Sequence, residues 1–241
     1  MSIAGLRAGL AALLLCLGPA SPLLAQKGAK SSARDLFYSE ASLIVSSHGS
    51  QKGRFAGAKK SVLAVTLGLK YRVWKLVDGQ PVKTDPEESF QLGDRVRLGV
   101  EVNDTGYLYV VHQQPEGQWR RLFPDPVIEH GAHFVRGGLV YPLPPERWIE
   151  LQPSSGGERF FVLLAREPVK ELEMLVAPRP ENSTGGAVVE IPDSALAGAR
   201  NLLIIKELVT EHSVQEKSVY VVNRTGKPDS LVGVEIRLAA R

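Results

Sequence analysis

Cysteine is nearly absent from this sequence of 241 residues, since Cys16 is the single one. A scaffold stapled by several disulfide bonds is therefore excluded, and the fold must be stabilised by packing. A long apolar segment is missing too. The run Ala8–Leu17 is the longest, and it is far shorter than the roughly 20 residues with which a helix spans a bilayer. We therefore expect no transmembrane segment in the mature chain.

The sequence also lacks a large excess of either sign of charge, with 29 Lys and Arg residues against 26 Asp and Glu residues. Proteins that bind nucleic acids concentrate basic residues on one face or helix. One local cluster, Lys52–Lys60, lies in a Gly-rich segment without any acidic residue. A solvated loop explains it, and contact with an anionic envelope surface or partner is the alternative. No nucleic-acid partner is expected.

The first 25 residues have the order of a secretory signal peptide, in which a charged residue, an apolar run and a small-residue cleavage site follow one another. Arg7 precedes Ala8–Leu17, and Ala25 supplies the small residue. Cleavage after Ala25 removes Cys16 and leaves no thiol nucleophile. We therefore expect a protein exported to the periplasm or secreted, with residues 26–34 as a flexible leader.

Alternation of apolar and polar residues, typical of strands with one buried face, recurs through the rest of the chain. In Arg95–Val102 the residues Val96, Leu98, Val100 and Val102 share one face. We expect this strand and 107–112 to form a hairpin through Asn103–Gly106, which 118–123 extends to a meander. Further strands are predicted over 63–77, 158–165, 201–209, 218–222 and 231–238, and one or two helical turns over 170–176.

This pattern predicts a mostly β fold, an antiparallel β-sandwich or partly open barrel with one or two short helices. We expect a β domain over residues 35–177 and a linker over 178–186, where Pro, Ser and Gly are frequent. The C-terminal strands of residues 187–241 are expected to complete the same sheet system.

The segment of about residues 88–170 resembles the bacterial family called domain of unknown function 4384. Four elements carry the resemblance by their order and spacing: Gly93-Asp94, Gly106–Val110, Leu122-Phe123-Pro124, and Gly157-Glu158 before an apolar strand. The resemblance implies an accessory or interaction domain, often in exported proteins or beside other modules. It implies no catalytic residues.

The triplet Asp104-Thr105-Gly106 matches the active-site sequence of aspartic proteases, where two such loops share one proton. The chain has no second copy of it, and Tyr107 is bulky where the protease loop is small. A turn explains the triplet through its tolerance of positive φ.

His130 and His133 with Glu129 and Asp125 contain the side-chain types of a metal cluster. Two histidines three positions apart in a Gly-containing loop are not the helical pair of zinc hydrolases. We expect solvated loop histidines, no metal and no cofactor. Two further histidines, His112 and His212, have no partner that the sequence identifies.

Aromatic and arginine side chains on the predicted meander are the better functional candidates, because Tyr, Trp and Arg dominate interface hot spots. Core packing is the favoured explanation of the aromatic residues, because aromatic side chains are mostly buried for stability. The candidate interaction residues are Tyr107, Tyr109, Trp119, Arg120, Arg121 and Phe123.

The sequence thus predicts an exported, non-catalytic β module that binds an envelope protein or a ligand. One alternative is a periplasmic hydrolase, which a pocket gathering Asp94, Asp125, Glu129 and His133 would favour. Another is a structural subunit that joins an assembly through its edge strand, for which Leu231–Leu238 is the candidate. The partner and the oligomeric state have no signature in the sequence.

Overall fold

A computed structural model describes residues 31–46, 66–153, 157–176, 190–203, 208–225, 227 and 229–241. The signal-like segment, the basic cluster of residues 52–60 and the linker of residues 178–186 lie outside the described residues. None of the helices in these described parts is long and apolar enough to cross a membrane.

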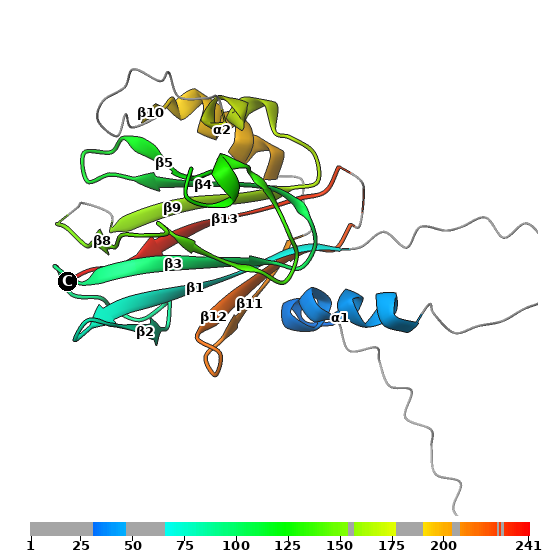
Figure 1. Cartoon of the computed structure of the whole chain (residues 1–241), viewed down its shortest axis with the longest axis horizontal. Helices are drawn as coiled ribbons and strands as arrows, with labels where there is room; N and C mark the ends of the chain where they lie inside the picture. The colour runs from blue at the N-terminus through cyan, green and yellow to red at the C-terminus, as the bar shows by residue number, and fades with distance from the viewer. Residues whose placement is uncertain are drawn as a thin grey trace, which may run out of the picture. The chain divides into compact units, whose positions relative to one another are not determined.

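Two antiparallel sheets face each other (Figure 1). The first, called the β1 sheet, has the strand order β11-β12-β1-β3-β7, with β2 also paired to β1 and β8 to β3. Its strands are β1 (Leu67–Val77), β2 (Gln80–Thr84), β3 (Arg95–Val102), β7 (Val140–Leu143), β8 (Ile149–Glu150), β11 (Leu208–Ser213) and β12 (Ser218–Asn223).

The second, called the β4 sheet, has the order β10-β5-β4-β9-β13, with β6 also paired to β4. Its strands are β4 (Gly106–Gln113), β5 (Trp119–Phe123), β6 (Phe134–Val135), β9 (Glu158–Ala165), β10 (Glu190–Ile191) and β13 (Leu231–Leu238). The predicted fold class, a mostly β antiparallel sandwich with few short helices, is confirmed.

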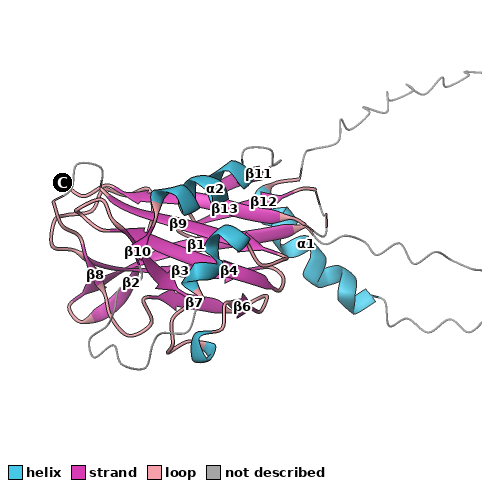
Figure 2. Ribbon diagram, turned by 90° about the horizontal axis from the view of Figure 1, so that it is seen from above, coloured by secondary structure: helices cyan, strands magenta, loops and turns pink. Residues whose placement is uncertain are grey.

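The helical segments are α1 (Ala33–Ser46), α2 (Asp193–Leu203) and the 3-10 segments η1 (Glu129–Gly131) and η2 (Lys170–Leu175). Helices α1 and α2 and the segment η2 lie on the outer faces of the two sheets, whereas η1 follows Ile128, which packs against the main core. Helix α1 contacts β12, and α2 contacts η2 and β13 (Figure 2). Neither α1 nor α2 was predicted, and the strand expected over 201–209 is wrong, because Asn201–Leu203 ends α2 and β11 begins only at Leu208.

The main core lies between the sheets, and strand alternation produces it. Inward-facing residues of β1, β3, β4 and β9 are fully buried there, as Leu69, Leu98, Val110 and Val162 illustrate. The opposite face of β4 carries Tyr109 into a second apolar cluster under η2 and α2. Both faces of β4 are therefore covered, as an apolar strand requires.

The predicted hairpin between β3 and β4 is wrong. Strand β3 pairs with β1, β7 and β8, whereas β4 pairs with β5, β6 and β9, so the chain crosses from one sheet to the other at residues 103–105. Asn103 holds the crossing to β1, since its Oδ1 accepts the Gly68 N–H at 2.7 Å and its amide donates to the Thr66 carbonyl. The β4–β5 hairpin is present as expected.

Candidate functional site

Three polar side chains interrupt the inner face of the β4 sheet where the apolar core ends. On β4, His112 follows Leu108 and Val110 on the same face, and on β9 Glu158 takes the inward position before Phe160. On β5, Arg120 lies directly opposite His112. We call Arg120, His112 and Glu158 the polar row, which runs across three neighbouring strands.

His112 and Glu158 form a buried hydrogen-bonded pair. Their side chains are only 8% and 3% exposed, and His112 Nε2 lies 2.5 Å from Glu158 Oε2. The imidazole stacks on Phe160 with 4.7 Å between ring centroids. The Gln114 amide nitrogen lies 3.0 Å from His112 Nδ1, and because an amide N–H only donates, Nε2 carries the proton toward Glu158. The hydrogen bond offsets the cost of burying this carboxylate.

The polar row opens into a pocket of about 600 Å³ at one end of the sandwich, a size typical of ligand sites. Figure 1 shows the β4–β5 hairpin and β8 at this same end of the two layers. The lining comes from β4, β5 and their turn, from the segment after β5, from the β7–β8 connection and from the start of β9. It consists of His112, Gln114, Pro115, Glu116, Arg120, Arg121, Leu122, Pro124, Asp125, Pro126, Pro144, Arg147, Trp148, Ile149, Glu150, Gln152 and Glu158.

The wall opposite the polar row is fixed by Arg97 on β3. Its guanidinium lies 4.4 Å from the centre of the Trp148 ring, and its Nη2 donates to the Arg147 carbonyl at 3.1 Å. A cation stacked on one face of an indole stabilises its orientation. Trp148 is therefore a positioned apolar wall of the pocket.

The six predicted interaction residues separate into two groups. Tyr109, Trp119 and Phe123 are buried and belong to the two apolar clusters, and Tyr107 packs beside His133 and Phe134. The Tyr109 hydroxyl donates to Glu173, and burial together with this hydrogen bond raises the pKa of Tyr109. These four aromatic residues pack within the fold, as the core interpretation expected.

The two arginines of the predicted set both line the pocket. Arg121 is anchored, since its Nη1 donates to the Leu175 carbonyl at 2.5 Å. Arg120 differs, because its Nε is buried and makes no hydrogen bond to any residue that the structure describes. Sequence reasoning missed the other pocket residues. A polar residue in an inward strand position, as at His112 and Glu158, is the signal that indicates them.

The acidic residues and histidines that were candidates for hydrolytic or metal chemistry do not gather in the pocket. The expectation of a solvated loop histidine is wrong for His133, whose side chain is 14% exposed and packs against Tyr107 and Tyr109. Of Asp94, Asp125, Glu129 and His133, only Asp125 lines the pocket, while Asp94 pairs with Lys75 at 2.8 Å. Among the described residues no group of three or more His, Asp or Glu side chains is arranged to hold a metal ion.

The expected positive φ is wrong for Asp104, Thr105 and Gly106, because none of them adopts it. Asp104 and His212 both have structural partners. The Asp104 carboxylate accepts the Thr105 N–H and binds Arg166 at 2.8 Å, so it stabilises the crossing between the sheets. His212 bonds Asp85 through Nε2 at 2.9 Å.

The fold and the pocket define a two-layered antiparallel β-sandwich with a polar site at one end. Within it, residues 89–168 match the model of the family described as Domain of unknown function (DUF4384), so the expected resemblance is confirmed for this segment. No curated protein and no solved structure matches the chain. All residues that line the pocket lie inside the matched segment, whereas β1, β12 and β13, which complete the sheets, lie outside it.

Proposed function

We propose that this protein is an exported, non-catalytic module of the cell envelope, and that it binds a partner protein or ligand through the pocket beside the polar row. The observation that carries the proposal is the pocket itself, which is built entirely by the DUF4384 segment and contains Arg120 with an unsatisfied buried donor. Proteins keep such donors paired because an unpaired one is costly. A bound partner supplies the acceptor.

The signal-like first 25 residues support the proposed location, and the combination of Arg120 with the apolar wall of Trp148 in the pocket lining supports binding. Both ring nitrogens of His112 are engaged, one by Glu158 and one by Gln114. These contacts count against His112 as a catalytic base. The His112–Glu158 pair is nevertheless an acid–base group, so a hydrolase is the second candidate.

Assembly through the edge strand is less well supported. Strand β13 pairs with β9 from Leu231 to Leu238 and contributes Val232 and Ile236 to the main core. Deleting it is therefore expected to unfold the protein rather than to release it from an assembly.

Site-specific photo-crosslinking in the native envelope tests the proposed function. A photoreactive residue replaces Glu116, which is exposed at the pocket rim, and in a matched variant it replaces Glu88, which is exposed and outside the lining. We expect a discrete crosslinked product from position 116 and none from position 88. A protein partner at the pocket is ruled out if the two positions give the same products or if position 116 gives none, and the proposal is wrong altogether if the pocket then binds no small ligand either.

A further inference from the structure

The polar row has an uneven distribution of charge. Glu158 is hydrogen-bonded by His112 and receives the Gln152 N–H at 3.5 Å, so its carboxylate is engaged. At the other end of the row, Arg120 is half-buried, and its guanidinium has neither an ion pair nor a hydrogen bond among the described residues. A guanidinium offers five N–H donors in a planar fork. The row therefore ends in a cation whose geometry suits a planar oxygen acceptor.

The carboxylates that share the pocket do not satisfy Arg120. Asp125 is used by its own loop, since its Oδ1 accepts the Val127 N–H at 2.9 Å. Glu116 and Glu150 are exposed and form no ion pair with Arg120. Their negative charge nevertheless lies along the wall. A doubly charged anion is repelled more strongly by these groups than a singly charged one.

The rest of the lining is suited to an apolar body attached to that anion. Trp148 is held by Arg97, and Pro115, Pro124 and Pro144 line the pocket beside it. Aromatic and proline side chains present rigid surfaces that lose little conformational freedom on binding. Arg121 and Arg147 add positive charge to the same lining.

We infer that the pocket binds a carboxylate, received by the Arg120 guanidinium as a two-point partner while Trp148 and the prolines contact the attached apolar group. This inference rests on the proposed function and names the chemistry of its ligand. A peptide C-terminus, an acidic side chain and a free small carboxylic acid all present this group, and the experiment separates these sources.

Titrations followed by the NMR signal of the Arg120 Nε–H test the inference. The probes are a short Pro- and Leu-containing peptide with a free carboxyl terminus, the same peptide amidated, an amidated version with one internal Glu, butyrate, and inorganic phosphate. We expect the signal to move with the free peptide, with the Glu-containing peptide, with butyrate or with more than one of these, which identifies the source. A response equal for the amidated peptide without Glu, tighter binding of phosphate, or no response to any probe would overturn the inference.

Substitution of Arg120 provides the second measurement. In Arg120→Gln we expect the affinity for the responding carboxylate to fall about 10- to 100-fold, because a charge-assisted bond is lost. Arg120→Lys keeps the charge but not the fork, so it is expected to recover only part of the affinity. Arg136→Gln, at an exposed arginine outside the lining, is the matched control and keeps full affinity.

The two proposals fail in different ways. Crosslinks from position 116 that are unchanged by Arg120→Gln, without carboxylate binding, would leave the proposed function standing and remove this inference. Carboxylate binding at Arg120 without any crosslink from position 116 would keep this inference and remove only the protein partner from the proposed function. The wild-type NMR titration decides the inference even if a variant does not fold.

Discussion

The outer faces of the two sheets are covered in contrasting ways. On the β4 sheet, α2 and η2 bury apolar side chains against the strands, with Leu196 and Leu172 packed onto Phe161 and Trp119 and all four buried. Burial of apolar surface stabilises the fold by roughly 25 cal/mol per Å². Unlike a hydrogen bond, it does not depend on the relative orientation of the groups in contact.

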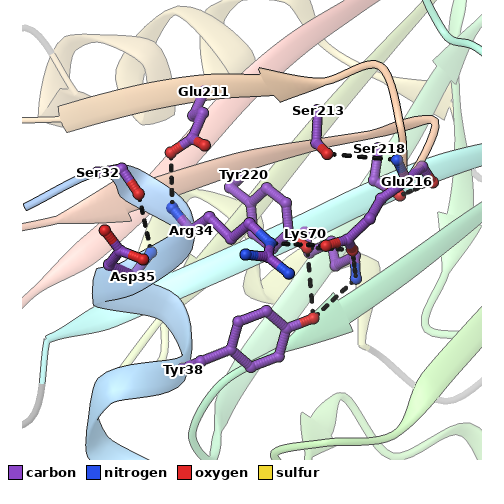
Figure 3. Close-up of polar contacts among 10 residues, drawn as sticks. All are labelled: Ser32, Arg34, Asp35, Tyr38, Lys70, Glu211, Ser213, Glu216, Ser218 and Tyr220. Carbon is purple, nitrogen blue, oxygen red and sulfur yellow. Dashed lines mark hydrogen bonds and ion pairs between the residues drawn. The ribbon is translucent and has the colours of Figure 1, made fainter.

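On the β1 sheet, the described side chains of α1 make an apolar contact through Ala33 and Phe37, which pack against Tyr220 and Val222 with Leu36 and Val209 beside them. Beside it lies a network of charges and hydroxyl groups (Figure 3). Glu216 is at the centre, where it accepts hydrogen bonds from Arg34 at 2.6 Å, from Lys70 at 2.9 Å and from the Tyr220 hydroxyl at 2.5 Å. This attachment is directional and depends on ionisation.

Lys70 shows how far the network compensates for burial. Its side chain is 6% exposed, and burial alone lowers its pKa, but the hydrogen bonds with Tyr220, Tyr38 and Glu216 outweigh burial and raise it. The ammonium group also lies 4.9 Å from the centre of the Tyr220 ring. The β1 sheet therefore holds α1 through charges that must remain paired, whereas on the β4 sheet a buried apolar cluster accompanies the polar contacts of Arg200 with Glu235 and of Tyr109 with Glu173.

The largest expected effect is on the apolar side of this comparison. Leu196→Ala removes a fully buried side chain from the α2 face and leaves a cavity, so we expect the free energy of unfolding to fall by about 2–5 kcal/mol. Urea denaturation measures it. Leu202→Ala, at an exposed position of the same helix, is the control and should cost less than about 0.5 kcal/mol. Equal losses would show that α2 is not held by apolar burial.

The sequence predicted the fold class because alternation identifies strands and their buried faces. The predicted hairpin between β3 and β4 is wrong, because alternation indicates which face of a strand is buried and not which sheet the strand joins. The apolar faces of both strands are consistent with a hairpin, and the crossing is visible only in the structure, from the different strand partners of β3 and β4. Helix α2 was missed where Asn201–Leu203 was assigned to a strand on its apolar content alone.

The site was predictable only in part. Arg120 and Arg121 were named for their residue type and lie in the pocket, but His112 had no visible partner because Glu158 is 46 positions away. A contact between two residues so far apart in the sequence depends on the register of β4 and β9, which a single sequence does not specify. Trp148 lies in the connection between β7 and β8 of the β1 sheet, outside the predicted meander.

The second effect addresses the ionic side of the comparison and depends on pH. Hydrogen bonds from Tyr220, Lys70 and Arg34 hold the pKa of Glu216 at about 2, below its usual 4.5. A carboxylate with a lowered folded-state pKa stabilises the fold above its unfolded pKa, and this contribution is lost as the pH falls through the folded value.

We expect Glu216→Gln to lower the free energy of unfolding at neutral pH, because buried Lys70 loses its counter-charge. The loss should be only about 1–2 kcal/mol, because Glu216 is partly exposed and solvent screens its charge. Denaturation of both proteins at several pH values should show the difference closing between pH 4.5 and about 2. Glu88→Gln, at an exposed position, is the control without a difference. A difference that persists unchanged at pH 2 would contradict the ionic account.

The smallest effect is expected at the exposed end of the same network. The Arg34 side chain is 49% exposed, so water and salt screen its contact with Glu216 more than they screen the contact of buried Lys70. Arg34→Gln should therefore cost less stability than Glu216→Gln at low salt, and nothing measurable at about 1 M NaCl, where the screening length is about 3 Å. The loss in Leu196→Ala should not diminish in the same salt series, because apolar burial carries no charge to screen. If salt changed both losses alike, the contrast between the two faces would not be one of charge against apolar packing.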